Sequence, residues 1–364
     1  MRDLTALWGT PMVPVLCEAC DWRYLVAGDI PTDQTCPHCA SQDLVELDPA
    51  DAGFPHAYPP ELIVPFEVEA GATEARVAAF AEEIPFAPED LTPARLRDRL
   101  RFLFLPMWMV DVDAEAQWQA DVGFDYEVVS HQERYTDGVG WRTEEVRESR
   151  IRWEPRVGRL TRRYENVVAP ALEGHARLQR VLGAYEVGRA TPYDAAAVEH
   201  AFVRAPDRAP DTAWTDAELG VRQRAAEECR RAADADHIRE FRWSLARAEK
   251  NWTLLLLPLF ATHYLDDEGQ IHRVLINGQS GRLYGSKRGS MARAQKRALL
   301  VGGIGLAIFV VGMIVALLSM VLPPALLIGV LLAFAGLLVG LGALVPIVRV
   351  WSFNRRQGGE LEEI

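Results

Sequence analysis

Hydrophobic residues are concentrated near the C-terminal end of the chain. From Ala298 to Val348 there is no Asp, Glu, Lys, Arg or His, a stretch of about 50 residues. One bilayer crossing needs about 20 apolar residues, so the segment is long enough for two. Pro323 and Pro324 break it into helices expected over Ala298–Val321 and Ala325–Val348. The pattern predicts a two-helix transmembrane hairpin, and a purely soluble protein is not expected.

Upstream of this segment, short apolar runs alternate with polar stretches and turn residues. A helix is predicted over Thr73–Glu83, with Thr73 as its N-cap. Long strands are predicted over Trp141–Trp153 and Arg159–Val168, separated by a turn at Glu154–Gly158. Most tryptophans here are expected in the core, namely Trp108, Trp118, Trp141, Trp153, Trp243 and Trp252. This mixture predicts an α+β domain with mostly antiparallel strands.

Two turns near residue 270 predict a meander of short strands. Asp266–Gly269 joins Thr262–Leu265 to Ile271–Val274 as a hairpin loop, and Asn277–Gly281 forms a tight turn before Arg282. Asn-Gly is a strong short-range signal for such a turn.

Residues 61–183 and 184–286 are weakly similar to each other. Each half is expected to open with a short strand and a helix, the second helix being Ala195–Val203. Each then contains a Leu-Pro strand, with Pro106 in the first half and Pro258 in the second. An additional helix over Thr215–Ala233 accounts for the longer spacing in the second half. The similarity predicts two copies of one structural unit.

The predicted organisation is multidomain α+β. Its parts are a zinc ribbon (1–47), a linker (48–60), α+β repeat one (61–183), α+β repeat two (184–286), a transmembrane helical hairpin (298–348) and a tail (349–364).

Four of the five cysteines lie in the first 40 residues. Cys17 and Cys20 form one C-x2-C pair, and Cys36 and Cys39 form a second, with 15 residues between the pairs. This spacing is typical of a zinc ribbon, in which two tight turns direct four thiolates at one ion. Four protein ligands complete a tetrahedral site and leave no position for a reacting water. The sequence therefore predicts a structural Zn²⁺ site.

Other interpretations of these residues are less favoured. Two disulfides would require an oxidising compartment, and the first 20 residues do not resemble a secretory signal. His38 lies inside a complete cysteine pair and is interpreted as a surface residue. Cys229, in a helical context, is interpreted as a small packing residue.

Charge divides the chain into two unequal parts. The formal net charge is −12, and residues 1–286 hold 31 basic and 48 acidic residues, a net charge of −17. An acidic body repels phosphate backbones, so broad nucleic-acid binding is not expected.

Basic residues flank the apolar segment on both sides. They are Lys287, Arg288, Arg293, Lys296 and Arg297 before it, and Arg349, Arg355 and Arg356 after it. By the positive-inside rule both flanks are cytoplasmic, which predicts a two-pass inner-membrane protein with both termini in the cytosol. A reducing compartment agrees with thiolate ligands. The basic flanks are also expected to contact anionic lipid.

Catalytic candidates are few. Asp111, Asp113 and Glu115 alternate, so on a strand they share one face and could hold a hard metal ion, although the solvated face of a strand explains them as well. No G-x-S-x-G, H-E-x-x-H or Walker-type phosphate loop occurs in the sequence. The chain is therefore expected not to be an enzyme.

Two further polar groups have simpler interpretations. Asp234, Asp236 and His237 follow a long helix and are expected at its exit rather than around a metal. His263 and His272 flank a hairpin loop and are expected to face each other on a solvated surface.

The order of these parts resembles a bacterial family of TFIIB-type zinc-ribbon membrane proteins. The resemblance rests on the four-cysteine ribbon, Leu105-Pro-Met-Trp108, Leu257-Pro-Leu-Phe260 and Val274-Leu-Ile-Asn-Gly-Gln-Ser-Gly281 before a C-terminal membrane segment. Phe260 stands where Trp is usual, and Ser280 where Thr is usual. Some relatives carry a primosomal helicase-like label, which this chain contradicts because it lacks a nucleotide-binding loop. Others lie beside phage-shock-protein-A-type, ESCRT-III-like membrane-stress proteins, which implies a scaffold role.

The sequence thus favours a non-enzymatic, membrane-anchored zinc-ribbon protein that recruits cytosolic protein partners at the inner membrane. A metal-dependent enzyme using carboxylates of the middle domain, and a nucleic-acid-binding zinc ribbon, are the alternatives. The identity of the partner and the oligomeric state do not follow from the sequence.

Overall fold

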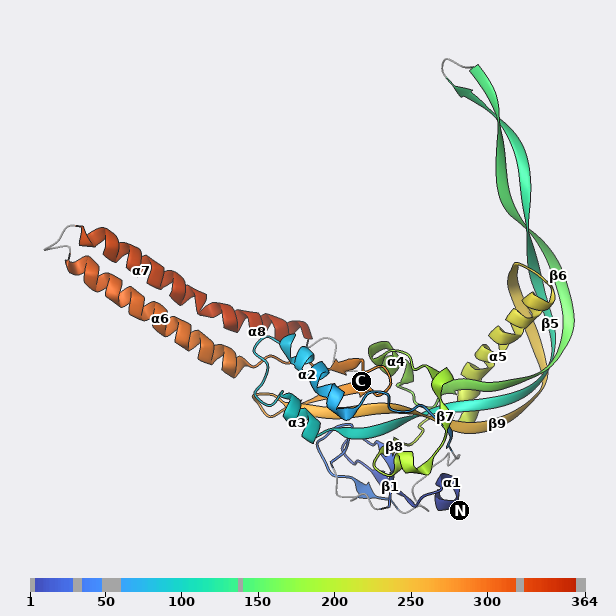
Figure 1. Cartoon of the computed structure of the whole chain (residues 1–364), viewed down its shortest axis with the longest axis horizontal. Helices are drawn as coiled ribbons and strands as arrows, with labels where there is room; N and C mark the ends of the chain where they lie inside the picture. Colours follow the sequence, from blue (N-terminus) through green and yellow to red (C-terminus); the bar gives the residue numbers. More distant parts are fainter. Residues whose placement is uncertain (1–3, 29–34, 48–59, 137–139, 319–323, 358–364) are drawn as a thin grey trace. The chain divides into compact units, whose positions relative to one another are not determined.

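The structure is a computed structural model that describes residues 4–28, 35–47, 60–136, 140–318 and 324–357 (Figure 1). The predicted linker 48–60 and the end of the predicted tail lie mostly outside these residues. The described strands are β1 (Met12–Leu16), β2 (Arg23–Ala27), β3 (Val45–Glu46), β4 (Pro60–Ile63), β5 (Arg101–Thr136), β6 (Gly140–Pro170), β7 (Thr191–Pro192), β8 (Phe202–Arg204), β9 (His237–Leu265), β10 (Ile271–Asn277) and β11 (Leu283–Gly285).

The described helices include three short 3-10 turns. The α-helices are α1 (Leu4–Trp8), α2 (Thr73–Glu82), α3 (Pro93–Asp98), α4 (His175–Leu182), α5 (Pro210–Ala232), α6 (Met291–Leu317), α7 (Ala325–Gly342) and α8 (Leu344–Gln357), and the turns are η1 (Ala70–Ala72), η2 (Val187–Arg189) and η3 (Ala195–Val198).

One mixed sheet contains all the described strands. Its main path runs β11-β10-β9-β5-β8-β2-β1-β3, with β6 paired to β5, and with β4 paired to β7 and β9. The β5–β8 pair is parallel, while the hairpins β1–β2, β5–β6 and β9–β10 are antiparallel. The predicted α+β class is therefore confirmed, with a mixed sheet.

The chain divides into two compact units. Unit 1 comprises residues 1–106, 173–205 and 256–364, and unit 2 comprises residues 107–172 and 206–255. The long strands β5 and β9 contribute residues to both.

The core of unit 1 forms where α2 and α3 cover β9 and β10. Phe80 of α2 and Leu96 of α3 pack with Phe260 and Tyr264 of β9 and Ile276 of β10, all of them buried. Burial of a large apolar side chain contributes about 1.5–3 kcal/mol, so this cluster holds the two helices on the sheet. The predicted hairpin between β9 and β10 is confirmed, as is the turn at Asn277–Gly281.

Two helix predictions within the α+β body differ from the structure. The N-cap of α2 is Ala72, and Thr73 is the first helical residue and is buried. Residues 195–203 form only the turn η3 followed by strand β8, because Phe202 and Val203 pair with β5 through Leu103 and Phe104. Sheet pairing outweighs the helix propensity of the alanines there.

Unit 2 is built on the antiparallel ribbon of β5 and β6. Its register runs from Met107 opposite Pro170 to Thr136 opposite Gly140. The predicted break at Glu154–Gly158 is wrong, because β6 continues through it. Proline has no N–H to donate to a neighbouring strand. Pro155 is tolerated because β6 pairs only with β5 in the described sheet, so the other edge of β6 needs no N–H donor.

Helix α5 covers one face of this ribbon. Its buried side chains are small and recur every three or four residues, at Ala213, Ala217, Val221, Ala225 and Cys229. Gly220 lies close to Val167 of β6, where an added Cβ would be 3.4 Å from Val167 Cγ1. Small residues therefore let α5 approach the strands closely, and Cys229 is a packing residue as predicted.

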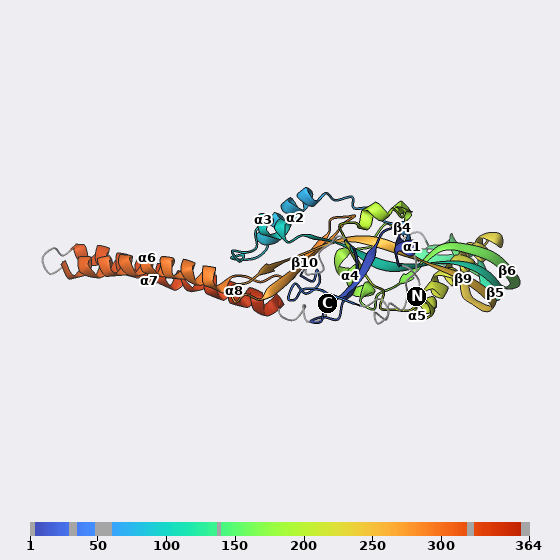
Figure 2. The ribbon, with the colours of Figure 1, turned by 90° about the horizontal axis from the view of Figure 1, so that it is seen from below.

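The C-terminal helices form an apolar hairpin. Helices α6 and α7 lie side by side (Figures 1 and 2). By length and composition, Met291–Leu317 and the helical stretch Leu326–Gln357 could each cross a membrane. The second predicted helix, Ala325–Val348, is divided, because α7 ends at Gly342 and α8 begins at Leu344. Helix α6 begins seven residues before the predicted Ala298, capped by the Ser290 hydroxyl, which accepts a hydrogen bond from the Arg293 N–H at 3.0 Å. Many outward side chains are exposed, including Leu299 at 77% and Leu327 at 69%.

Glycines bring the two helices into backbone contact. A Cβ on Gly312 would lie 2.3 Å from Ala333 N, whereas a Cβ on Gly303 would meet nothing within 4 Å. Gly312→Leu is therefore expected to separate α6 from α7 and to lower the thermal midpoint of the detergent-solubilised chain by several degrees. Gly303→Leu is the matched control. Equal midpoints for the two variants would show that close packing at Gly312 does not hold the hairpin together.

Asp90 fastens the loop before α3 to β9. Its carboxylate accepts from Arg95 Nη1, from Arg99 and from the Leu265 N–H, the last at 2.8 Å. Burial alone would raise the pKa of Asp90, but the hydrogen bonds from Arg99, Leu265 and Arg95 outweigh it and lower the pKa from 3.8 to about 2.

Asp90→Asn is expected to destabilise the chain by about 2 kcal/mol at pH 7. Because the folded pKa is depressed, this stabilisation is complete above pH 4 and is lost as the pH falls towards 2. Urea unfolding of both proteins, followed by tryptophan fluorescence, should show a difference that shrinks over this window. A difference that is constant with pH would contradict the assignment.

Candidate metal centre

Two cysteine loops of the same design face each other in unit 1. In the first, the Cys17 N–H donates to Trp22 O, and Cys17 O accepts from the Asp21 N–H, each at 2.9 Å. In the second, Cys36 donates to Gln42 O and accepts from Ala40 N, again at 2.9 Å. The residue after each second cysteine is left-handed, with φ of 57° at Asp21 and 53° at Ala40. Each loop thereby turns both of its thiols to one side.

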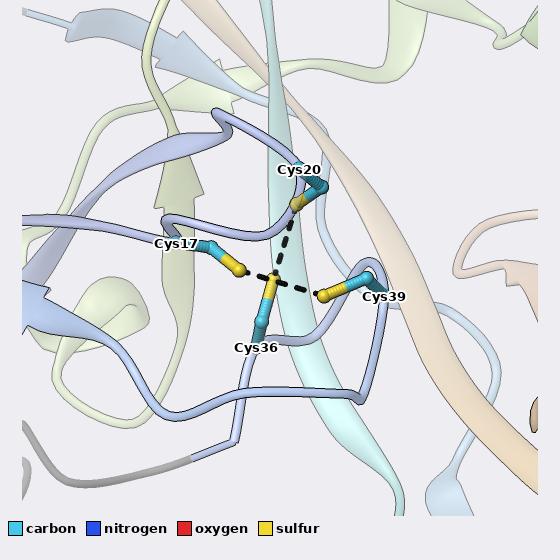
Figure 3. A group of neighbouring side chains, drawn as sticks. All are labelled: Cys17, Cys20, Cys36 and Cys39. Atoms are coloured by element: carbon cyan, nitrogen blue, oxygen red, sulfur yellow. Dashed lines mark hydrogen bonds between the residues drawn. The ribbon is translucent and has the colours of Figure 1, made fainter.

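The four thiols converge on one point (Figure 3). All four Sγ atoms lie within 4.8 Å of one another, with Cys17–Cys39 at 3.4 Å and Cys20–Cys36 at 3.8 Å. A tetrahedral ion with metal–sulfur bonds of about 2.3 Å separates its sulfurs by about 3.8 Å. Cys17, Cys20, Cys36 and Cys39 therefore fit the ligand set of a tetrahedral metal ion. Zinc and iron both suit four thiolates.

The electrostatics of the cluster also favour a cation. A hydrogen bond from Cys20, assisted by Tyr24, lowers the pKa of Cys36 to about 5, while burial raises the pKa of Cys17. Four thiols this close, two of them buried and two half-buried, cannot all ionise without a compensating positive charge. A bound divalent cation supplies that charge and deprotonates its thiol ligands.

Polar groups around the cluster support the sulfur atoms. The Ser41 hydroxyl donates to Cys39 Sγ at 3.0 Å, and the buried Tyr24 hydroxyl lies 3.5 Å from Cys36 Sγ. Neither residue was among the predicted site residues. The apolar run of strand β2, in which every residue from Tyr24 to Ala27 is buried, is the signal that could have found Tyr24.

His38 is not the surface residue that the sequence predicted. Its ring stacks on Trp22 with centroids 3.7 Å apart, and Arg204 lies over the Trp22 ring at 4.6 Å. Burial, with the charges of Arg273 and Arg204, lowers the pKa of His38 to about 3, so its neutral Nε2 accepts from Arg273 Nη1. His38 joins the second cysteine loop to strand β10 and is not a metal ligand.

The cysteine loops belong to the main sheet. Strand β2 pairs with β8 through Tyr24–Arg204 and Leu25–Val203, and β8 pairs with β5. Arg204 Nη1 also donates to Arg23 O at 3.1 Å. The candidate metal centre therefore lies at one end of the sheet of unit 1 and is not a separate module.

The carboxylates of the alternative site are already paired. Asp111 and Asp113 both face Arg163, at 3.3 and 3.6 Å, and Asp111 also accepts from the Asn166 N–H at 2.9 Å. These carboxylates, Asp113 foremost, raise the pKa of Arg163. Asp113 and Glu115 line an open cavity of about 260 Å³, but the arginine stands where a metal would bind.

The remaining polar candidates have structural roles. Asp236 and His237 follow α5 and both bind Asp125. The Asp236 carboxylate accepts from the Asp125 N–H at 2.9 Å, and His237 Nε2 lies 2.9 Å from the Asp125 carboxylate. The predicted helix exit is confirmed.

His263 and His272 do not face each other, because His272 is opposite Tyr264 and His263 is opposite Arg273. The imidazole of His272 instead bridges Ser286 and Asp266, each at 2.9 Å.

Comparison with known proteins adds no relative. No protein-family model, curated protein or solved structure matches the chain.

Proposed function

We propose that the chain is a non-enzymatic, membrane-anchored zinc-ribbon protein that recruits or scaffolds cytosolic proteins at the inner membrane. The proposal rests on one observation: the four-cysteine cluster and both apolar helices belong to the same compact unit, unit 1. The metal would stabilise the same body that the helices attach to the bilayer.

Zinc is the proposed metal. Cys17, Cys20, Cys36 and Cys39 use all four positions of a tetrahedral ion, which favours a structural role over a catalytic one. A metal-dependent enzyme centred on Asp111, Asp113 and Glu115 has less support, because Arg163 neutralises two of these carboxylates. The net charge of −12 speaks against nucleic-acid binding.

The proposed topology is two-pass with both ends cytoplasmic. Arg293, Lys296 and Arg297 lie at the start of α6, and Arg355 and Arg356 lie at the end of α8. Positive residues at both outer ends of the hairpin support this orientation. The cysteines would then lie in the reducing cytosol, where thiolate–metal centres persist.

We also propose the internal duplication and the family assignment that the resemblance implies. The two Leu-Pro motifs lie on the neighbouring strands β5 and β9, which supports the duplication. The second half lacks a counterpart of α2, since η3 stands in its place. A phage-shock-protein-A-type, ESCRT-III-like protein is the proposed class of partner, on the resemblance alone.

The proposed contact surface is the β5–β6 ribbon of unit 2. At the described end of this ribbon, Tyr135 and Trp141 pair across the strands with ring centroids 5.5 Å apart, and Trp141 is 70% exposed, contrary to its predicted core position. Exposed aromatic pairs are typical anchors of protein interfaces. Arg–Glu pairs such as Arg147–Glu145 and Arg150–Glu148 keep the remaining ribbon polar.

Cross-linking in native membranes, followed by capture of the full chain and mass spectrometry, tests this function. Tyr135→Ser with Trp141→Ser should reduce recovery of the specific partner by about tenfold or more. Leu219→Ser removes an apolar side chain of α5 that is 52% exposed and should leave recovery unchanged.

If the Tyr135→Ser, Trp141→Ser double variant and the Leu219→Ser variant recover equal amounts of the partner, the β5–β6 ribbon is not the contact surface. Absence of any reproducible partner would contradict the scaffold role. Deleting residues 1–47 is a poorer test, because it removes the strand that pairs with β8.

A further inference from the structure

A cavity of about 380 Å³ lies in unit 1 where the chain enters and leaves the apolar hairpin. Its lining includes Arg76 of α2, Gly281 and Arg282 before β11, Lys287 before α6, and Gln357 at the end of α8. Small-molecule sites typically have volumes of about 300–1,000 Å³, so one headgroup fits.

The lining carries uncompensated positive charge. Its three cations are Arg76, Arg282 and Lys287, and Glu83 is the acidic side chain among the lining residues. Glu83 is neutralised by Lys287, whose Nζ lies 2.5 Å from Glu83 Oε2. Within the described part of the chain, no carboxylate pairs with the guanidinium groups of Arg76 or Arg282. Two arginines beside one cavity repel each other, and an anion between them removes that repulsion.

Arg76 is held in place by the turn that follows β10. Its Nη1 donates to Gly281 O at 2.9 Å. Gly281 has a φ of 70°, and a Cβ there would lie 2.3 Å from Arg76 Cζ, so only glycine leaves room for the guanidinium. The turn is itself rigid, because the fully buried Asn277 accepts from the Gln279 and Ser280 N–H groups at 2.9 and 3.0 Å.

We propose that this cavity binds a phosphate ester, with the headgroup of an anionic phospholipid as its source. Guanidinium groups bind phosphate oxygens through paired, charge-assisted hydrogen bonds. Lys287 and Gln357 place the cavity at the end of the hairpin that also carries Arg293 and Lys296. The lipid source rests on the proposed membrane anchoring, whereas the phosphate site does not.

The test uses the full chain in detergent micelles containing equal amounts of phosphatidylglycerol and phosphatidylcholine. Lipids retained after purification are counted by mass spectrometry. The wild type should retain phosphatidylglycerol over phosphatidylcholine by about tenfold. Arg76→Gln with Arg282→Gln should abolish this preference. Arg147→Gln with Arg150→Gln removes the same charge from β6, outside the cavity lining and outside the basic flanks of the hairpin, and should preserve it.

Two further measurements separate the possible results. Gly281→Ala should weaken the preference without changing the charge, because it displaces Arg76. Calorimetric titration with inorganic phosphate tests a soluble source. If phosphate binds, the binding requires Arg76 and Arg282, and no lipid preference is seen, the site stands and its ligand is a soluble phosphate ester.

The proposal would be overturned if the wild type neither preferred phosphatidylglycerol nor bound phosphate. It would also be overturned if both double variants lost the lipid preference to the same extent. Flotation with liposomes reports on the anchor separately. A chain that fails to float but still binds phosphate would contradict the membrane anchoring and leave the site standing.

Discussion

Cys36→Ser is expected to abolish metal retention and to unfold the N-terminal end of the unit 1 sheet. Cys36 is 1% exposed and lies 3.8 Å from Cys20 Sγ, so no solvent ligand can replace its thiolate without rearrangement. Structural zinc contributes about 10–16 kcal/mol in small isolated zinc domains. Here the loops also pair with β8, and we expect a smaller cost, about 3 kcal/mol or more.

The measurements are metal content by mass spectrometry and thermal unfolding in detergent. The wild type should hold about one metal ion per chain, because four thiolates complete one tetrahedral site. The same analysis distinguishes zinc from iron. Cys229→Ser, which alters a buried thiol of α5 outside the cluster, should keep the metal. Metal retention by Cys36→Ser would rule out the four-thiolate site.

Val311→Arg is expected to abolish stable membrane integration. Val311 lies near the middle of the apolar part of α6 and is 52% exposed, so its side chain faces lipid if the helix spans a bilayer. A central arginine costs about 2.5–3.5 kcal/mol on insertion scales and more in simulations. Alkaline extraction of membranes should release this variant, while the wild type should stay in the pellet.

Leu299→Arg is the control for Val311→Arg. Leu299 is 77% exposed and follows Arg297 near the start of the apolar segment, where a long cation can extend its charge to the interface. This variant should remain in the membrane pellet. Identical extraction of the two variants would argue against a membrane-spanning α6.

The sequence was most informative where the controlling interactions are local. The C-x2-C spacing identified all four residues of the thiol cluster, because each pair is positioned by its own turn. The absence of charge from Ala298 to Val348 indicated the helical hairpin, and Asn277–Gly281 indicated the tight turn. In each case the relevant contacts lie within a few residues, or composition alone decides the environment.

Predictions failed where a distant strand changed the outcome. Residues 195–203 have helix propensity, but β8 forms there by pairing with both β5 and β2. His38 was expected in solvent, yet Trp22 and Arg273 enclose it. None of these partners can be inferred from local pattern, because they are separated from it by tens to hundreds of residues.

The sequence by itself determined a thiolate metal ligand set, an α+β body of acidic charge and an apolar helical hairpin with basic flanks. Only the tertiary structure decided that the cysteine loops extend the main sheet through β8, that Arg163 occupies the carboxylate cluster, and that Arg76 and Arg282 line one cavity. The physical reason is the distance along the chain over which each interaction acts. Turn geometry and hydrophobicity act over a few neighbouring residues, whereas strand pairing, ion pairing and cavity formation depend on residues that meet only after the chain has folded.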